Sequence, residues 1–142
     1  MPDIDERKAI ARELIEIIKD SGVINQLDIT PKEIRIGVFY TGVVLSSGHA
    51  GMSYTPVQEI PEAVCCPRSH AKMPAAGELL NMQIAGLMDY SLDDNALKAA
   101  VGMATLNALS SILLADDTCR YKPSAYGNAL DLVEITGEDT VA

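Results

Sequence analysis

The residues of this chain best suited to chemistry are two adjacent cysteines and two histidines. Cys65 and Cys66 precede His70 in a Cys-Cys-x3-His arrangement, and His49 stands earlier in the chain. Thiolates and imidazoles are the donors that zinc and soft transition metals prefer. The spacing is not that of a zinc finger, and a free cysteine is often a small buried apolar residue. We therefore weigh a metal site with these four ligands against a purely structural role.

A second candidate is the glycine-bearing stretch Gly48-His49-Ala50-Gly51. Glycines allow successive backbone N–H groups to point into one concavity, which can bind an anion. Gly48 and Gly51 are thus candidate backbone donors to a cofactor or other anionic ligand. A tight hairpin turn also requires glycine, and this is the alternative interpretation.

Motifs for known reactions are absent from the sequence. There is no Gly-x-Ser-x-Gly, no phosphate-binding loop, and no carboxylate at motif spacing from either histidine. Whether the protein is an enzyme is left open by the residues. Asn107 stands in an apolar run, so we expect its amide to bond to backbone across the core or to a loop, because an unpaired buried amide costs about 1 to 3 kcal/mol.

Composition narrows the class of partner. The chain has 142 residues, which suits one domain, and a net charge of -9 with no dense basic cluster. This charge argues against nucleic acid and membrane surfaces as partners. The N-terminus lacks a secretory signal, and three cysteines do not make a disulfide framework, so we expect a cytoplasmic protein with reduced thiols.

The N-terminal half predicts a helix followed by strands. Asp3 and Glu6 form a capping box, the apolar face is Ile10, Leu14, Ile17 and Ile18, and Gly22 ends the helix. Irregular chain with room for a short strand is expected at 23–29, a turn at Thr30-Pro31, and one interior strand over 34–45. A hairpin through 46–51 leads to a strand at 52–55. Residues 56–74, with four prolines, form a long loop.

The C-terminal half predicts helices. Apolar spacing indicates one helix over 75–88, and Ser91 with Asp94 three residues later indicates the start of another that runs to about Ala115. The second helix is apolar all round, so we expect it to be enclosed at the centre of the domain rather than to span a membrane. Residues 118–129 are a linker. Strands followed by helices indicate an α+β domain with an antiparallel sheet.

Residues 131–142 predict a short strand, a polar turn at 137–139 and the opening of a further strand. A strand that starts so near the end has no partner to pair with, so we expect one domain of a longer protein.

Several segments together resemble the putative heavy-metal-chelation family. They are Ile36-Gly-Val-Phe-Tyr-Thr-Gly-Val-Val-Leu45 with its glycine-rich hairpin, Ser91 before Met103-Ala-Thr-Leu-Asn-Ala-Leu109, and Gly127-Asn-Ala-Leu-Asp-Leu132 before Gly137-Glu-Asp-Thr-Val141. The resemblance implies an enolase N-terminal-like α+β domain over residues 1–130, with a three-stranded antiparallel sheet. Residues 131–142 would then be a linker and the start of an absent Rossmann-like domain. The resemblance does not identify the cysteines as ligands.

Three functions remain open on the sequence. The leading hypothesis is a metal-binding or heavy-metal-chelating protein that uses a soft or borderline metal such as zinc. The second is a small-molecule-binding enzyme or sensor, with a pocket between this domain and the Rossmann-like domain. The third is a scaffolding or dimerisation domain, which would make the protein a homodimer.

Overall fold

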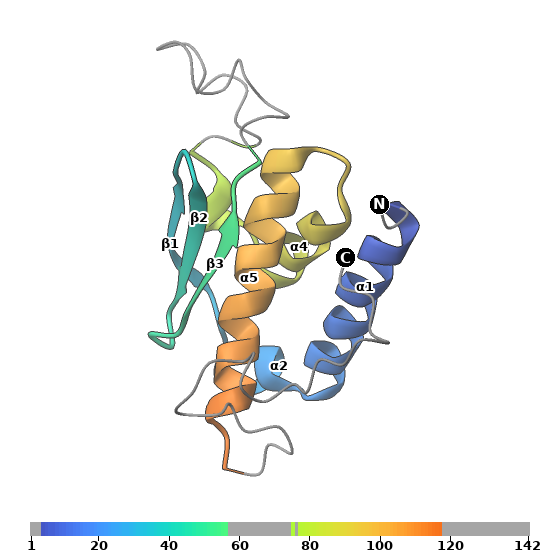
Figure 1. Cartoon of the computed structure of the whole chain (residues 1–142). Coiled ribbons are helices and arrows are strands. Elements are labelled where there is room, and N and C mark those ends of the chain that lie inside the picture. Colours follow the sequence, from blue (N-terminus) through green and yellow to red (C-terminus); the bar gives the residue numbers. More distant parts are fainter. Residues whose placement is uncertain (1–3, 57–74, 76, 118–142) are drawn as a thin grey trace, which may run out of the picture.

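The structure is a computed structural model that describes residues 4–56, 75 and 77–117 (Figure 1). Several predictions therefore lie outside the described residues. These are the helix cap at Asp3, the loop with Cys65, Cys66 and His70, the linker at 118–129, and the strand and domain boundary at 131–142.

The described residues form an α+β fold, as predicted. Strands β1 (Pro31–Ile36), β2 (Tyr40–Leu45) and β3 (Ala50–Tyr54) make one antiparallel sheet in the order β1-β2-β3. Opposite partners include Ile34 with Val43 and Val43 with Gly51. The predicted hairpin between the last two strands is confirmed. Val43 and Leu45 point to the core, while alternate residues point to the other face of the sheet.

The prediction of a single strand over 34–45 is wrong. A turn at 37–39 divides this run into β1 and β2, and Gly37 N donates to Tyr40 O at 2.9 Å to close it. A side chain at Gly37 would place its Cβ 2.8 Å from Tyr40 O, so the turn depends on glycine here. The valine and aromatic residues around it concealed the break, because they favour strands on either side.

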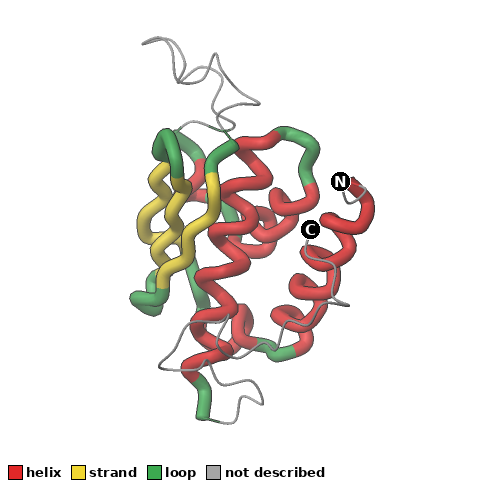
Figure 2. The backbone as a smooth tube through the Cα atoms, viewed as in Figure 1, coloured by secondary structure: helices red, strands yellow, loops and turns green. Residues whose placement is uncertain are grey.

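Helices cover one face of the sheet (Figures 1 and 2). In chain order they are α1 (Ile4–Asp20), α2 (Val23–Leu27), the 3-10 turn η3 (Leu79–Asn81), α4 (Ile84–Asp89), the 3-10 turn η4 (Tyr90–Leu92) and α5 (Ala96–Ala115). Helix α5 lies between the sheet and α1, and contacts β2, β3, α4, η4 and α1. It is therefore the central element, as its apolar sequence predicted.

Of four local predictions, three need correction and one is confirmed. Residues 23–27 are helical rather than irregular or extended, and Pro31 begins β1 rather than closing a turn; the left-handed stop at Gly22 is confirmed by its φ of 71°. The helix predicted over 75–88 is two pieces, η3 and α4, because Met82 and Gln83 are extended.

The buried face of α1 is rotated from the predicted one. Ala11, Ile15 and Ile18 are buried, whereas Ile10 and Ile17 are 71% and 52% exposed. Ala11 was not counted in the predicted apolar face because its side chain is small, but it belongs to the buried core.

The N-cap of helix α5 is Asn95 rather than Ser91. Ser91 belongs to η4, where it is buried and its hydroxyl has no hydrogen-bond partner among the described residues. The end at Ala115 is as predicted. By length and composition alone α5 could cross a membrane, but nine of its residues are buried inside the domain, and core helices pass the same test.

Strand β3 runs along a strip of alanines on α5. Ala100, Ala104 and Ala108 are buried at helical spacing, and a Cβ added at Gly51 would collide with Ala104 O and Ala108 N. Ser53 Oγ donates to Ala100 O at 2.6 Å, one turn nearer the start of the helix. Strand and helix therefore touch backbone to backbone, in opposite directions.

Asn107 holds the free edge of this strand. Its Nδ2 donates to Met52 O at 2.7 Å, so the predicted bond to backbone is confirmed. The side chain is exposed rather than buried, because it reaches along the outside of β3. Because this bond occupies the Met52 carbonyl, that group is not free to pair with an edge strand of another chain.

We expect Gly51→Ala and Gly102→Ala each to lower the free energy of unfolding by roughly 3 kcal/mol or more, because the added methyl group meets backbone that cannot move aside. At Gly102 that backbone is Ser91 N and Tyr90 C. Chemical denaturation monitored by circular dichroism measures the change.

Gly86→Ala is the matched control, since an added Cβ there meets only Met82 Cε at 3.6 Å in helix α4. It should be neutral or slightly stabilising, by up to about 1 kcal/mol. Equal effects of all three substitutions would show that the close approach to α5 is not what limits these positions.

Candidate functional site

The segment that carries Cys65, Cys66 and His70 lies outside the described residues, but its two points of attachment are described. It leaves the domain at Pro56, just after β3, and returns at Ala75, just before η3. We call residues 57–74 the Cys-His segment. Whether its three donors converge stays a prediction.

The point of departure is fixed by several hydrogen bonds. Thr55 N donates to Phe39 O at 2.8 Å, and the Thr55 hydroxyl lies 2.8 Å from the hydroxyl of Thr41. Both threonines are buried, at 1% and 0% exposed. The bond from Ser53 to Ala100 ties the same end of β3 to the first turns of α5. Any ligand held by the Cys-His segment is thus attached to a rigid end of the sheet.

His49 lies at the other end of β3. It sits in the β2–β3 hairpin, half-buried, with Nδ1 3.2 Å from Ser47 Oγ. Pro56 lies seven residue steps further along the chain, which corresponds to about 23 Å of extended strand. The nine steps from Pro56 to Cys65 can span at most about 30 Å. His49 can therefore join the three other donors only if the segment runs back along the sheet towards the hairpin.

The two candidate glycines belong to different parts of the hairpin. Gly48 has a φ of 85° and donates from its N to Leu45 O at 2.9 Å, as a left-handed turn residue does. Gly51 is within β3 and faces the backbone of α5. Close packing against α5 thus explains why residue 51 is glycine, and the left-handed turn explains why residue 48 is glycine. Anion binding by these two residues stays a prediction.

Among the described residues, no group of three His, Cys, Asp or Glu side chains is placed to hold a metal ion. The acidic residues there are spread over the surface or paired with lysines, as Asp93 is with Lys98 and Asp89 is with Lys19 at 4.0 Å. Donors for a metal must therefore come at least partly from outside this part of the chain.

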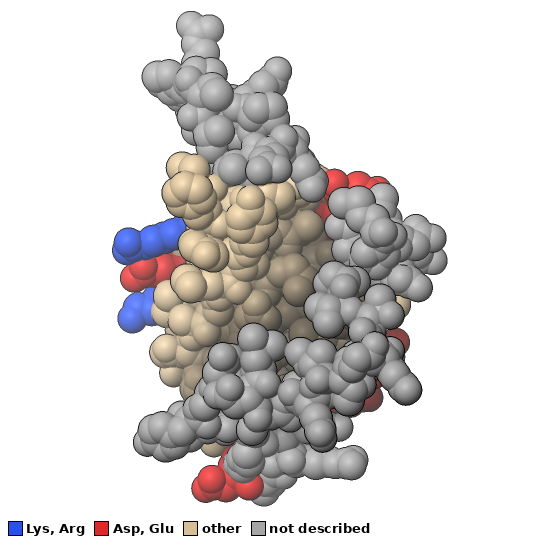
Figure 3. Space-filling model, in the orientation of Figure 1, with Lys and Arg blue, Asp and Glu red and all other residues tan. Residues whose placement is uncertain are grey.

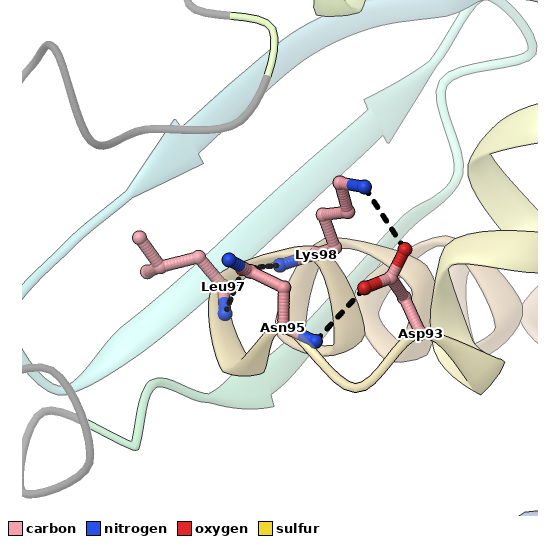
Figure 4. Close-up of polar contacts among 4 residues, drawn as sticks. All are labelled: Asp93, Asn95, Leu97 and Lys98. Carbon is pink, nitrogen blue, oxygen red and sulfur yellow. Dashed lines mark hydrogen bonds and ion pairs between the residues drawn. The ribbon is translucent and has the colours of Figure 1, made fainter.

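The start of α5 carries the most connected polar cluster of the described residues (Figure 4). Asn95 Oδ1 accepts hydrogen bonds from Leu97 N and Lys98 N, both at 3.1 Å. Asp93 Oδ1 accepts from Asn95 N at 2.8 Å, and Asp93 Oδ2 accepts from Lys98 Nζ at 2.9 Å. These contacts satisfy the N–H groups of Asn95, Leu97 and Lys98, three of the four that lack a partner within the helix.

The electrostatics of this cluster follow from its hydrogen bonds. The bond from Asn95 N–H, and then that from the Lys98 ammonium, hold the pKa of Asp93 below its ordinary value of 3.8. The hydrogen bond with Asp93 raises the pKa of Lys98. Lys98 Nζ also lies 5.2 Å from the centre of the Tyr90 ring. A carboxylate held ionised and a lysine held protonated cannot exchange protons near neutral pH, so the cluster acts as a helix start and not as an acid–base pair.

A second ion pair connects this cluster to α1. Lys8 Nζ donates to Asp94 Oδ1, and the Lys8 side chain is only 24% exposed. The two adjacent aspartates thus bind different helices: Asp93 contacts Lys98 of α5, and Asp94 contacts Lys8 of α1.

The Asn95 cluster was missed in the sequence because Ser91 offered a competing capping box. Asparagine is as good an N-cap as serine, and Asp93 stands five residues before Lys98, a spacing that only the turn preceding the helix can close.

Comparison with known proteins gives one match. The family model described as putative heavy-metal chelation matches residues 12–110, which include α5 as far as Ser110, all three strands and the Cys-His segment. No curated protein and no solved structure matches the chain significantly.

Asn95→Ala should lower the free energy of unfolding by about 1 kcal/mol, because two N–H groups at the start of α5 lose their acceptor. The control is Asn81→Ala, which removes an exposed amide whose contact with Glu78 Oε2 is 3.4 Å long. We expect no measurable change there. Denaturant titration of the two variants beside the wild type distinguishes a cap from a generic loss of asparagine.

The Asp93–Lys98 pair should make stability depend on pH. Because folding lowers the pKa of Asp93, its contribution is present above 3.8 and is lost as the pH falls through the lower folded value. Because folding raises the pKa of Lys98, its contribution is full below 10.5 and is lost as the pH rises through the higher folded value.

The measurement is the difference in unfolding free energy between the wild type and Asp93→Asn across this range. It should be largest at neutral pH and shrink towards both limits. Asp89→Asn, whose lysine contact is long and exposed, should show little difference at any pH. A difference for Asp93→Asn that does not change with pH would contradict the ion pair.

Proposed function

The chain belongs to the putative heavy-metal-chelation family, and we propose that it binds a soft or borderline transition metal ion through Cys65, Cys66 and His70. The observation that carries the proposal is the family match over residues 12–110, which include these three donors. Two thiolates and one imidazole form a donor set suited to Zn²⁺ and to softer ions.

The described residues support this choice of ligands in two ways. They contain no competing group of three donors, so the soft ligands of the Cys-His segment are the natural candidates. The segment is also attached to a rigid support, through the buried Thr41–Thr55 pair and the bond from Ser53 to α5. A pre-organised attachment point lowers the entropy cost of ligand binding.

Three protein ligands leave a tetrahedral ion with one open position. That position would admit water, a thiol or another exchangeable ligand, as a protein that takes up and releases metal requires. His49 is the predicted fourth ligand, and it closes the site only if the segment lies along the sheet towards the hairpin. Loss of affinity in His49→Ala therefore separates a closed site from an open one.

The test is a titration of the reduced protein with Co²⁺ under anaerobic conditions, followed by displacement with Zn²⁺. Cobalt bound by thiolates gives a charge-transfer absorption that reports the cysteines directly. Cys65→Ser, Cys66→Ser and His70→Ala should each weaken binding by more than roughly 100-fold, because even outer-shell partners of a metal cost 10- to 100-fold. Affinity should also fall in acid, where protons compete for the donors.

Cys119→Ser is the matched control, since it removes the one cysteine that lies outside the Cys-His segment. It should leave affinity and stoichiometry unchanged. Binding that survives in all three ligand variants, or that is lost equally in Cys119→Ser, would refute the assignment. A wild type that gives no thiolate absorption would refute metal binding by the cysteines altogether.

A further inference from the structure

The face of the sheet that points away from the helices ends in an apolar patch. Tyr40 on β2 is directly opposite Tyr54 on β3, and Met52 follows on the same face of β3. Val38 and Phe39, in the turn between β1 and β2, stand at the same end. We call these five residues the aromatic patch. It contains the chain's one phenylalanine and two of its five tyrosines.

All five side chains are open to solvent. Their exposed fractions are 52% for Val38, 66% for Phe39, 61% for Tyr40, 63% for Met52 and 57% for Tyr54. Together they present on the order of 600 Å² of mostly apolar surface, at the upper end of what monomeric proteins expose in one patch. A surface of this size normally marks an interaction site.

This face carries no acidic excess, although the chain as a whole is strongly acidic. The pairing register places Glu33 and Arg35 of β1 beside the patch, and their side chains form an ion pair at 2.9 Å. Lys32, exposed at the bulge in β1, adds a further cation next to this pair. Figure 3 shows basic and acidic side chains projecting together at the border beside β1.

We propose that the aromatic patch is the interface of a homodimer, in which the outer sheet faces of two copies pack on each other. Two copies would bury about 1,200 Å² through the patch alone, which reaches the lower limit of specific interfaces. The proposal is independent of metal binding.

Charge favours a second copy over another partner. Elsewhere two copies of a chain with a net charge of -9 repel each other, but here each copy offers one carboxylate and one guanidinium. A twofold axis brings Glu33 of one copy to Arg35 of the other, and the reverse, so the face is complementary to itself. An acidic partner would be attracted by Arg35 but repelled by Glu33, and for a basic partner the two effects would be reversed.

The shape of the face also suits sheet-to-sheet packing. Gly42 lies between Arg35 and Met52 in the register, and Ala50 is nearby on β3. These small residues leave the middle of the face low, so that two sheets can approach to about 10 Å with the tyrosines and methionines interleaved at the ends.

Gly42 gives a sharp test. An added side chain there has no protein atom nearer than 4.0 Å and needs no left-handed backbone, so the monomer should tolerate Gly42→Glu. The glutamate would nevertheless project into the proposed interface. We expect sedimentation velocity to show a concentration-dependent dimer for the wild type, and a dissociation constant raised at least about tenfold in Gly42→Glu and in Tyr54→Lys.

Ile17→Glu is the control, because it replaces an exposed apolar residue on α1, on the other side of α5 from the sheet. It should dimerise as the wild type does. Thermal denaturation confirms that each variant is folded. A wild type that is monomeric at all concentrations would refute the proposal, and so would a dimer that Ile17→Glu disrupts while Gly42→Glu does not.

Exchange of charges tests the twofold arrangement itself. Glu33→Arg and Arg35→Glu each place like charges across the interface and should weaken the dimer. The double variant restores opposite charges in both copies and should recover most of the affinity. If the double variant is as weak as the single ones, the two residues do not face each other across the axis.

Discussion

The fold depends on the absence of side chains at two contacts with α5. At Gly51 the backbone of β3 touches the backbone of α5, and at Gly102 the backbone of α5 touches that of η4. Contacts this close bring the main chains themselves into van der Waals range, and they leave no room for relaxation if a methyl group is added. The alanine strip on α5 is the other half of the same constraint. Direct main-chain contacts among β3, α5 and η4, rather than interlocking large side chains, thus set the relative positions of these elements.

This constraint also decides where chemistry can be attached. Strand β3 follows the alanine strip towards the start of α5 and ends beside the first turns of that helix. There Ser53 is bonded to α5, and Thr55 is bonded to Thr41 and Phe39. The Cys-His segment leaves the domain at that point. The Asn95 cap and the pair of Asp93 with Lys98 stabilise the same end of α5. The Cys-His segment therefore begins at an end of the domain that several polar contacts hold together.

The sequence predicted the large elements because each had one dominant signal. Apolar residues all round 99–115 indicated an enclosed helix, and alternation beside Gly48 indicated a hairpin. It failed where two signals of similar strength competed, as with Ser91 and Asn95 for the N-cap, or where a glycine was needed for proximity rather than for a turn. Gly51 is such a case, since only the position of α5 reveals why it carries no side chain. For the candidate site, the residue types indicated a metal, but the separation of His49 from Pro56 along β3 could be known only once the strand was placed.

The two proposals share one end of the sheet, and this has a thermodynamic consequence. Tyr54 of the aromatic patch lies two residues before Pro56, where the Cys-His segment begins, and Phe39 of the patch accepts the hydrogen bond of Thr55. A metal ion bound by the segment therefore lies near the proposed interface in the sequence. If metal binding favours the dimer, the dimer must favour metal binding by the same factor, because coupling between two binding events is reciprocal. In a chain with a net charge of -9 the sign of such coupling has a clear electrostatic contribution. A bound cation lowers the repulsion between two acidic copies, so metal binding and self-association should strengthen each other, most strongly at low ionic strength.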